Sequence, residues 1–476
     1  MASHSKISAG VIWAAIDKFG IVFLQFVINI ILARLLTPQD FGLVGMIMIF
    51  VVIAQMLVDG GFGSALIQKQ NTTSTDYSTI FYWNFLFSVL LYLIIYVSSN
   101  SIASFFDMPL LAKLLRLLGV IVIINSFGLV QKTKLRKQLE FKKIAITDIV
   151  SYIIASCVTI LIAYKGYGVW SLVWMYVINA IVSSTLFWCL SSWYPTFQFS
   201  IESLKSLFSY GGFMLIAEIM QNICTHIQGV IIGHNFSAKE TGLYTQAKKM
   251  DEVASLTIPA IMCQVLFPLL SKHQNDENRL ISILKISQQS AAFVIFPLMI
   301  LLIIVAEPLL LMLYGNQWIE AVPYFQVLCI GGLFSALYNF GYYAVAAIGK
   351  SRALFYWGCY KWGMLLVLLL IGASISVDAV LWAMVLSNLN IFVTNALLVQ
   401  HYIKYKLMDQ IKDVLSVLIL SILCGILFYY IFIHYNINWI IVSISFMVMY
   451  LMLGYVFKLS SVNAIRSFVL SFVKKK

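Results

Sequence analysis

Charged residues are scarce in this chain of 476 amino acids: Asp, Glu, Lys and Arg together make up 11% of it, whereas 61% is hydrophobic. A soluble globular domain carries about 25% charged residues, so this composition excludes that class. No connection between the apolar segments is long enough to fold as a separate enzyme domain. The chain is therefore predicted to be an integral membrane protein in which any chemistry takes place within the helices or at their ends.

Cysteine and proline are also few. The 7 cysteines stand singly in apolar segments, without the spacing of a disulfide framework or a metal cluster, and no cofactor is expected. Two of the 8 prolines, Pro259 and Pro268, fall in one predicted helix, where they produce a kink that is either static or part of a transport cycle. Gly349-Lys350-Ser351 lacks the first glycine of a phosphate loop. This sets ATP-driven transport aside, so the candidate energy sources are a proton or sodium gradient, the membrane potential, or the downstream consumption of the transported molecule.

Long apolar runs dominate the sequence instead. A membrane-spanning helix needs roughly 20 apolar residues, and about fourteen segments qualify. Most of the 31 Lys and Arg residues lie on alternate connections, which places both termini in the cytoplasm by the positive-inside rule. The net charge of +12 is therefore a topology signal and does not indicate nucleic-acid binding. The basic cluster at 132–143 is a further topology signal or a contact for anionic lipid headgroups.

The sequence also resembles itself at an offset of 200 residues. Residues 31–43, ILARLLTPQDFGL, recur as residues 231–243, IIGHNFSAKETGL. We predict a six-helix lobe at 1–200, a second six-helix lobe at 201–405, and an additional helix pair with a basic tail at 406–476. Since each lobe contains an even number of helices, the repeat is parallel, as in transporters whose two halves surround a central cavity. Arg34, Asp40 and Glu240 lie in the repeated turns and are candidate gate or turn residues.

Polar residues inside the apolar segments are functional candidates because a charge at the bilayer centre costs several kcal/mol. On the first segment, Lys18, Gln25 and Asn29 share one helical face. The seventh segment has a polar face made of Glu218, Gln221, Asn222, Thr225 and Gln228. On the eighth segment, one face holds Tyr244, Lys248, Asp251 and Ser255, and Lys249 and Glu252 are turned about 100° away from it.

Two interpretations of these charges remain open. Those of the eighth segment either neutralise one another at i,i+3 and i,i+4 spacing, or Lys248 faces the cavity and attracts an anion. Lys18 either contacts the substrate or pairs with Asp17 or Glu218. Asp148 and Lys361 have no identifiable partner, and Asp59 is expected to belong to a backbone turn with the glycines that follow it.

Several stretches resemble the polysaccharide branch of the multidrug/oligosaccharidyl-lipid/polysaccharide exporter superfamily, the Wzx/WzxC-like lipopolysaccharide and capsule flippases of bacteria. They are residues 32–43, LARLLTPQDFGL; 59–68, DGGFGSALIQ; 242–244, GLY; 265–271, VLFPLLS; and 307–315, EPLLLMLYG, followed by Trp318. The resemblance implies two lobes around a cavity and no enzymatic activity. It further implies movement of an undecaprenyl-pyrophosphate-linked oligosaccharide across the inner membrane, with the polysaccharide polymerase machinery as a candidate partner.

In such flippases, basic residues on the first, second and eighth helices meet the pyrophosphate. The resemblance therefore selects Lys18, Lys248 and Lys249 here, although the second helix has no basic residue in its interior. The candidates for polar and sugar contacts in the cavity are Gln25, Asn29, Glu218, Gln221, Asn222, Thr225 and Asp251.

Two other functions compete with a flippase. A cation-coupled multidrug exporter of the same superfamily would use uncompensated carboxylates, for which Glu218, Asp59 and Asp148 are available. A membrane glycosyltransferase or polymerase would need catalytic acids in long outer connections, and the outer connections of this chain are short.

Overall fold

The computed structural model describes residues 2–435 and 437–457, and it describes the side chains of these residues except 2–12, 14, 15, 209–214 and 216–218. The regular elements of the described part are all helices. Thirteen helical segments are long and apolar enough to cross a membrane. Each of the fourteen predicted segments falls on a helix; the one near residue 220 is α8, which is not among the thirteen. The prediction of an all-α polytopic membrane protein is confirmed.

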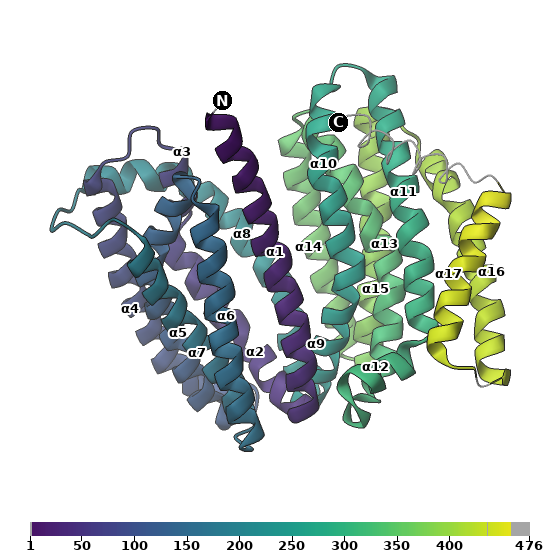
Figure 1. Cartoon of the computed structure of the whole chain (residues 1–476), viewed down its shortest axis with the longest axis horizontal. Coiled ribbons are helices and arrows are strands. Elements are labelled where there is room, and N and C mark those ends of the chain that lie inside the picture. The colour runs from purple at the N-terminus through teal and green to yellow at the C-terminus, as the bar shows by residue number, and fades with distance from the viewer. Residues whose placement is uncertain (1, 436, 458–476) are drawn as a thin grey trace. The chain divides into compact units, whose positions relative to one another are not determined.

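The first compact unit runs from Met1 to Gly242. Its helices are α1 (Ala2–Leu35), α2 (Pro38–Asp59), α3 (Phe62–Gln68), α4 (Ser74–Phe105), α5 (Leu110–Lys137), α6 (Phe141–Tyr164), α7 (Val169–Leu190), α8 (Ile201–Asn235) and the start of α9 (Ala238–Glu252). As Figure 1 shows in purple to teal, α4 packs on α5, α6 on α7, and α1 on α6. Small residues allow close packing inside this unit: the Ser88 hydroxyl lies 3.1 Å from that of Ser126, and Gly128 lies against Ser184.

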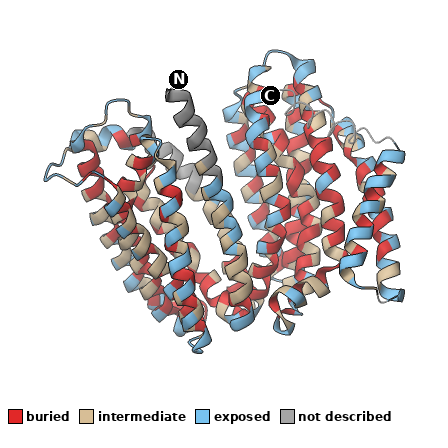
Figure 2. Cartoon of the chain, viewed as in Figure 1, coloured by how far each residue is buried: buried red, intermediate tan, exposed pale blue. Residues whose placement is uncertain are grey.

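The second compact unit runs from Leu243 to Lys476. It contains the rest of α9 followed by η1 (Val253–Thr257), α10 (Ile258–Lys272), α11 (Glu277–Ile304), α12 (Ala306–Tyr314), η2 (Asn316–Trp318), α13 (Ala321–Ala347), α14 (Ser351–Ala373), α15 (Val377–Ile403), α16 (Leu407–Tyr435) and α17 (Trp439–Val456). The central helix is α13, which packs against α10, α11 and α15. Figure 2 shows burial concentrated on α11, α13 and α15, whereas α16 and α17 expose many residues. Exposed apolar side chains on the last two helices suit contact with lipid.

The compact units divide the chain at a different residue from the repeat. Helix α8 begins at Ile201, the start of the second predicted lobe, yet it packs on α2, α3 and α4 of the first unit. Packing and internal symmetry can divide a chain at different residues, because a helix that belongs to one repeat can pack on helices of the other repeat. The lobes at 1–200, 201–405 and 406–476 remain a prediction from the repeat.

The eighth predicted segment is not a continuous α-helix. It consists of α9, a π-helical turn at Val253–Thr257, and α10, with Pro259 in the first turn of α10 and Pro268 inside it. A proline lacks the amide donor that an α-helix requires in its interior, and π-helical turns are known places of helix distortion. The irregularity follows directly after the charged residues Lys248, Lys249 and Asp251.

Candidate functional site

In both copies of the repeated turn, a hydroxyl side chain caps the start of the following helix. Thr37 caps α2 in a capping box, accepting a hydrogen bond from the Asp40 amide while the Asp40 carboxylate accepts one from the Thr37 amide. In the second copy, the Ser237 hydroxyl accepts a hydrogen bond from the Glu240 amide over 3.1 Å. Asp40 and Glu240 therefore stand in equivalent positions at the start of their helices, and Arg34 is exposed in the last turn of α1. A gating role for these three residues remains a prediction.

The two turns also contact each other through glycine. A Cβ added to Gly42 would overlap the carbonyl oxygen of Ala238, and a Cβ added to Gly242 would overlap the carbonyl oxygen of Pro38. Pro38 and Ala238 are equivalent under the 200-residue offset, as are the two glycines. The contact is therefore reciprocal, and it brings two helix starts so close together that neither glycine has room for a side chain.

The polar face of α1 is accessible. Lys18 and Gln25 are exposed and Asn29 is half-buried. The neighbouring Asp17 is half-buried, and its Oδ1 is buried without a hydrogen-bond partner in the part of the chain that the structure describes. Lys18 is therefore open to a ligand, whereas Asp17 turns partly into the packing of the first unit.

Asp148, for which the sequence offered no partner, forms an ion pair. The Lys132 Nζ atom lies 2.7 Å from its Oδ2, and only 16% of the Asp148 side chain is exposed. Lys132 comes from the basic cluster at 132–143. The sequence could not identify this partner because the two residues sit on different helices, α5 and α6, and the sequence does not show how these helices align.

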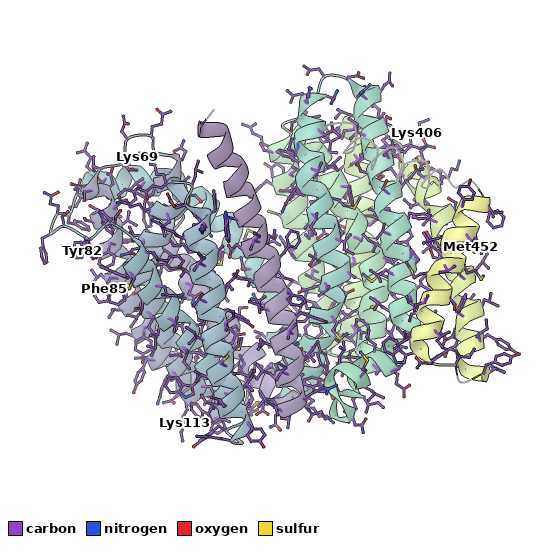
Figure 3. All side chains as sticks on the ribbon, viewed as in Figure 1. Lys69, Tyr82, Phe85, Lys113, Lys406 and Met452 are labelled. Carbon is purple, nitrogen blue, oxygen red and sulfur yellow. The ribbon has the colours of Figure 1, made fainter. Side chains whose placement is uncertain are left out.

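A second lysine of the basic cluster stabilises a turn. The Lys137 Nζ donates hydrogen bonds to the Leu66 carbonyl over 2.8 Å, to the Lys69 carbonyl, and to the Thr72 hydroxyl over 3.0 Å. Lys69, labelled in Figure 3, forms an ion pair with Asp76 at 2.9 Å. Lys137 thereby satisfies carbonyls at the end of α3, a role that positive charges near a helix C-terminus often have.

The glycine run after α2 is a turn, as predicted. Gly60 and Gly61 have φ values of 55° and 71°, a region that favours glycine. The Asp59 carboxylate accepts a hydrogen bond from the Gly63 amide over 3.2 Å. The backbone geometry accounts for both glycines without a ligand.

On α8, the described candidates lie along one accessible stretch. Gln221 is exposed, and Asn222 and Thr225 are half-buried. The Thr225 hydroxyl donates to the Gln221 carbonyl over 2.8 Å. The Glu218 side chain lies outside the described residues.

The charges at the end of α9 have different surroundings. Lys248 lies 3.8 Å from Glu252 in an i,i+4 pair and 5.7 Å above the Tyr244 ring, while Lys249 is exposed. Asp251 is only 9% exposed. Its Oδ2 accepts a hydrogen bond from Ser255 over 3.0 Å, and its Oδ1 has no hydrogen-bond partner among the described residues. A Cβ on Gly332 would lie 2.7 Å from that Oδ1, so Asp251 packs against α13.

Comparison with known proteins identifies the family. A family model described as "Polysaccharide biosynthesis protein" matches residues 31–323, more than half of the chain. The chain belongs to this polysaccharide biosynthesis protein family. The matched range contains both copies of the repeated turn and all of the sequence stretches that carry the resemblance to polysaccharide exporters. That resemblance is thereby confirmed.

Proteins with assigned names resemble the chain over most of its length. The teichuronic acid biosynthesis protein TuaB of Bacillus subtilis is 28% identical over 437 residues, which cover 89% of this chain and 88% of that protein. The lipopolysaccharide biosynthesis protein WzxC of Escherichia coli is 23% identical over 342 residues, which cover 71% of this chain and 69% of that protein. This member of the polysaccharide biosynthesis protein family is thus similar to one protein named for teichuronic acid biosynthesis and to another named for lipopolysaccharide biosynthesis.

Solved structures show the same fold. The lipid II flippase MurJ in an inward closed conformation aligns with a TM-score of 0.77 at 16% identity, covering 94% of this chain and 98% of that chain. An inward-facing multidrug resistance transporter of the MATE family aligns with a TM-score of 0.63 at 16% identity and covers 82% of this chain. It belongs to the MOP superfamily, the abbreviation for the multidrug/oligosaccharidyl-lipid/polysaccharide exporters. The family member described here therefore has the fold of MOP superfamily transporters.

Proposed function

We propose that this protein moves a polyprenyl-pyrophosphate-linked oligosaccharide from the cytoplasmic to the outer leaflet of a bacterial inner membrane by alternating access, without covalent chemistry. The observation that carries the proposal is the family match over residues 31–323 on a chain with thirteen candidate membrane spans. Transport of this kind needs a pathway through the bilayer, and a fold made of membrane-spanning helices can supply one. The glycan repeat unit would belong to an O-antigen, capsule or exopolysaccharide, and the polymerase machinery would receive it.

The chemistry of such a substrate fits the accessible polar residues. A pyrophosphate and a glycan cannot enter hydrocarbon without replacing the hydrogen bonds that they make with water. Exposed Lys18 and Lys249 and half-buried Lys248 offer cations for the pyrophosphate. Gln25, Asn29, Gln221, Asn222 and Thr225 are the candidates for the sugar hydroxyls, with Glu218 as a further polar group.

Asp251 plays a different part in the proposal. Because it is buried against α13, it contacts sugar only if the distorted segment of α9 and η1 rearranges during transport. The π-helical turn that follows it at Val253–Thr257 is a place where such a rearrangement can occur.

The test is the lipid content of a host strain that lacks the protein. We expect one defined undecaprenyl-pyrophosphate oligosaccharide to accumulate, detected by mass spectrometry of extracted lipids, and to disappear when the wild-type gene is restored. Variants with Lys18→Met or Lys249→Met, at normal abundance, should restore flipping only in part.

A drug exporter would give the opposite result. If no lipid-linked glycan accumulated and the strain became sensitive to cationic dyes, the proposed substrate would be wrong. If both lysine variants restored flipping fully, the flippase function would still hold, but Lys18 and Lys249 would not belong to its anion site.

A further inference from the structure

Lys361 is a buried cation in the middle of a membrane-spanning helix. It lies halfway along α14 (Ser351–Ala373) and only 9% of it is exposed. Its ammonium lies 4.2 Å from the centre of the Trp362 ring and 4.7 Å from that of Tyr338. The Trp357 ring is 5.6 Å away.

No carboxylate of the described residues forms an ion pair with Lys361. Within the part of the chain that the structure describes, its hydrogen-bond contact is a long one, 3.5 Å to the Tyr338 hydroxyl. Aromatic rings attract a cation, but the stabilisation from each cation–π contact is smaller than the free-energy cost of burying a charge at the depth of the bilayer. An intramembrane lysine held in this way is a functional candidate that still needs an anion.

The rings around Lys361 are held in place by their own contacts. The Trp357 indole donates a hydrogen bond to the Thr394 hydroxyl over 3.2 Å, which ties α14 to α15. The Trp357 ring also packs against Tyr338 and Tyr342, at centroid distances of 6.3 and 6.1 Å. The aromatic box therefore exists before any ligand arrives, which lowers the entropic cost of binding.

There is open space beside the lysine. Gly358 precedes Lys361 by three residues, so on the helix surface it lies about 60° from Lys361, between Lys361 and Trp362. Apart from its chain neighbours and the backbone of its own helix, no atom of the described residues lies within 4 Å of a Cβ added to Gly358. Gly363 has the same open surroundings, but it lies about 160° from Lys361 on the other side of the helix, which makes it a matched control position.

We propose that Lys361, together with Tyr338, Trp357 and Trp362, binds an anionic group of the transported glycolipid, and that an attached sugar ring occupies the space beside Gly358. Membrane lipid headgroups lie outside the hydrocarbon core, which is about 30 Å thick, so an anion that reaches the middle of α14 has to belong to a molecule carried through the protein. Phosphate and sugar carboxylate both satisfy this chemistry. The proposal rests on the proposed function and assigns a binding site on α14 to an anionic group of its substrate.

Binding to the purified full-length protein distinguishes the two sources of negative charge. The probes are geranylgeranyl pyrophosphate, which has a lipid anion and no sugar, and a galacturonate tetrasaccharide, which has sugar carboxylates and no lipid. We expect Lys361→Met to weaken the binding of one probe about tenfold or more, and Lys361→Arg to keep most of it. An effect on the first probe assigns the site to the carrier lipid, and an effect on the second assigns it to the glycan.

The glycine pair tests the space beside the lysine. Gly358→Leu should weaken binding of the same probe, because the new side chain fills the space, whereas Gly363→Leu should leave it unchanged. Wild-type protein that binds neither probe, or a Lys361→Met variant that binds both as the wild type does, would overturn the proposed site.

Thermal unfolding separates a binding role from a packing role. If Lys361 is kept for a ligand, Lys361→Met removes an uncompensated buried charge, and its unfolding temperature without ligand stays equal or rises. A lower unfolding temperature together with unchanged probe binding would show that the lysine serves packing alone, against the proposal.

The proposed function and this site can fail separately. If a deletion strain accumulates the lipid-linked glycan and Lys361→Met restores it fully, the proposed site at Lys361 is wrong and the proposed flippase function still holds. A deletion strain that accumulates no such lipid would contradict the flippase proposal, and the loss of binding of either probe in Lys361→Met would then decide whether the anion site exists.

Discussion

Lys132 stabilises two carboxylates in the first compact unit. It forms an ion pair with Asp148 at 2.7 Å and interacts electrostatically with Asp17, whose Oδ1 has no hydrogen-bond partner among the described residues. Replacing one partner of a largely buried pair leaves the other charge unpaired. We therefore expect Lys132→Met to lower the free energy of unfolding by about 2 kcal/mol, measured as a lower thermal midpoint of the detergent-solubilised protein.

The matched control for this pair is Asp148→Asn. The double variant Lys132→Met/Asp148→Asn lacks the Asp148 charge that Lys132→Met leaves unpaired, so it should be more stable than Lys132→Met alone. Equal midpoints for the single and double variants would show that the unpaired Asp148 carboxylate costs no stability.

Sequence periodicity predicts contacts within a helix better than contacts between helices. The i,i+4 pairing of Lys248 with Glu252 was one of two interpretations drawn from spacing, and the structure contains that pair. The partners of Asp148 and Lys137 could not be predicted. Lys132 is 16 residues from Asp148, and Leu66 is 71 residues from Lys137, so these contacts depend on how helices align.

At the level of elements, the crossing of the two repeated helix starts depends on Gly42 and Gly242. A methyl group at either position would overlap a backbone carbonyl oxygen, which cannot move aside as a flexible side chain can. We expect Gly42→Ala and Gly242→Ala each to lower the free energy of unfolding by about 1–3 kcal/mol. The two losses should be similar because the contact is reciprocal.

Gly363→Ala is the control for this prediction, because nothing lies within 4 Å of its added Cβ. It should be neutral or slightly stabilising, since alanine favours a helix more than glycine does. Thermal midpoints of the three variants, compared with the wild type, would show whether close approach or glycine content matters. A stable Gly42→Ala protein would mean that the helices can separate at this crossing without cost.

For elements, the sequence was a good guide to where helices lie and a poor guide to how they are interrupted. All of the predicted segments are helical, because runs of apolar residues of this length have few alternatives in a bilayer. The repeat also predicted the equivalent turns at Thr37 and Ser237. The π-helical turn at Val253–Thr257 could not be read from Pro259 and Pro268 alone, since proline predicts a disturbance without specifying its hydrogen-bond pattern.

For the whole molecule, the distribution of Lys and Arg predicts how the chain is threaded through the membrane. The connection after α3 and the connection after α14 should lie on opposite sides, with the first in the cytoplasm. Gln70 and Ser374 are exposed in these connections. In a background without the 7 natural cysteines, we expect Ser374→Cys to react with an impermeant maleimide added to intact spheroplasts, and Gln70→Cys to react only after the membrane is opened.

Labelling of Gln70→Cys in intact spheroplasts would show that the connection after α3 lies outside the cell, opposite to the predicted orientation. Restoration of flipping by both cysteine variants is the control that shows that the labelled protein is correctly inserted. The orientation of the termini follows from this result, because the fourteen predicted spans return the chain to the side from which it starts.

The reciprocity at Gly42 and Gly242 has a consequence for the ancestry of the molecule. Where residue i of one copy meets residue j of another, and j meets i, the contact is isologous, the arrangement by which two identical subunits form a closed dimer. Here Gly42 meets Ala238, and Gly242 meets Pro38, the counterpart of Ala238. One half of the chain, present twice, would supply both sides of the crossing. This is the contact that gene duplication and fusion of a self-pairing, half-length membrane protein would leave behind.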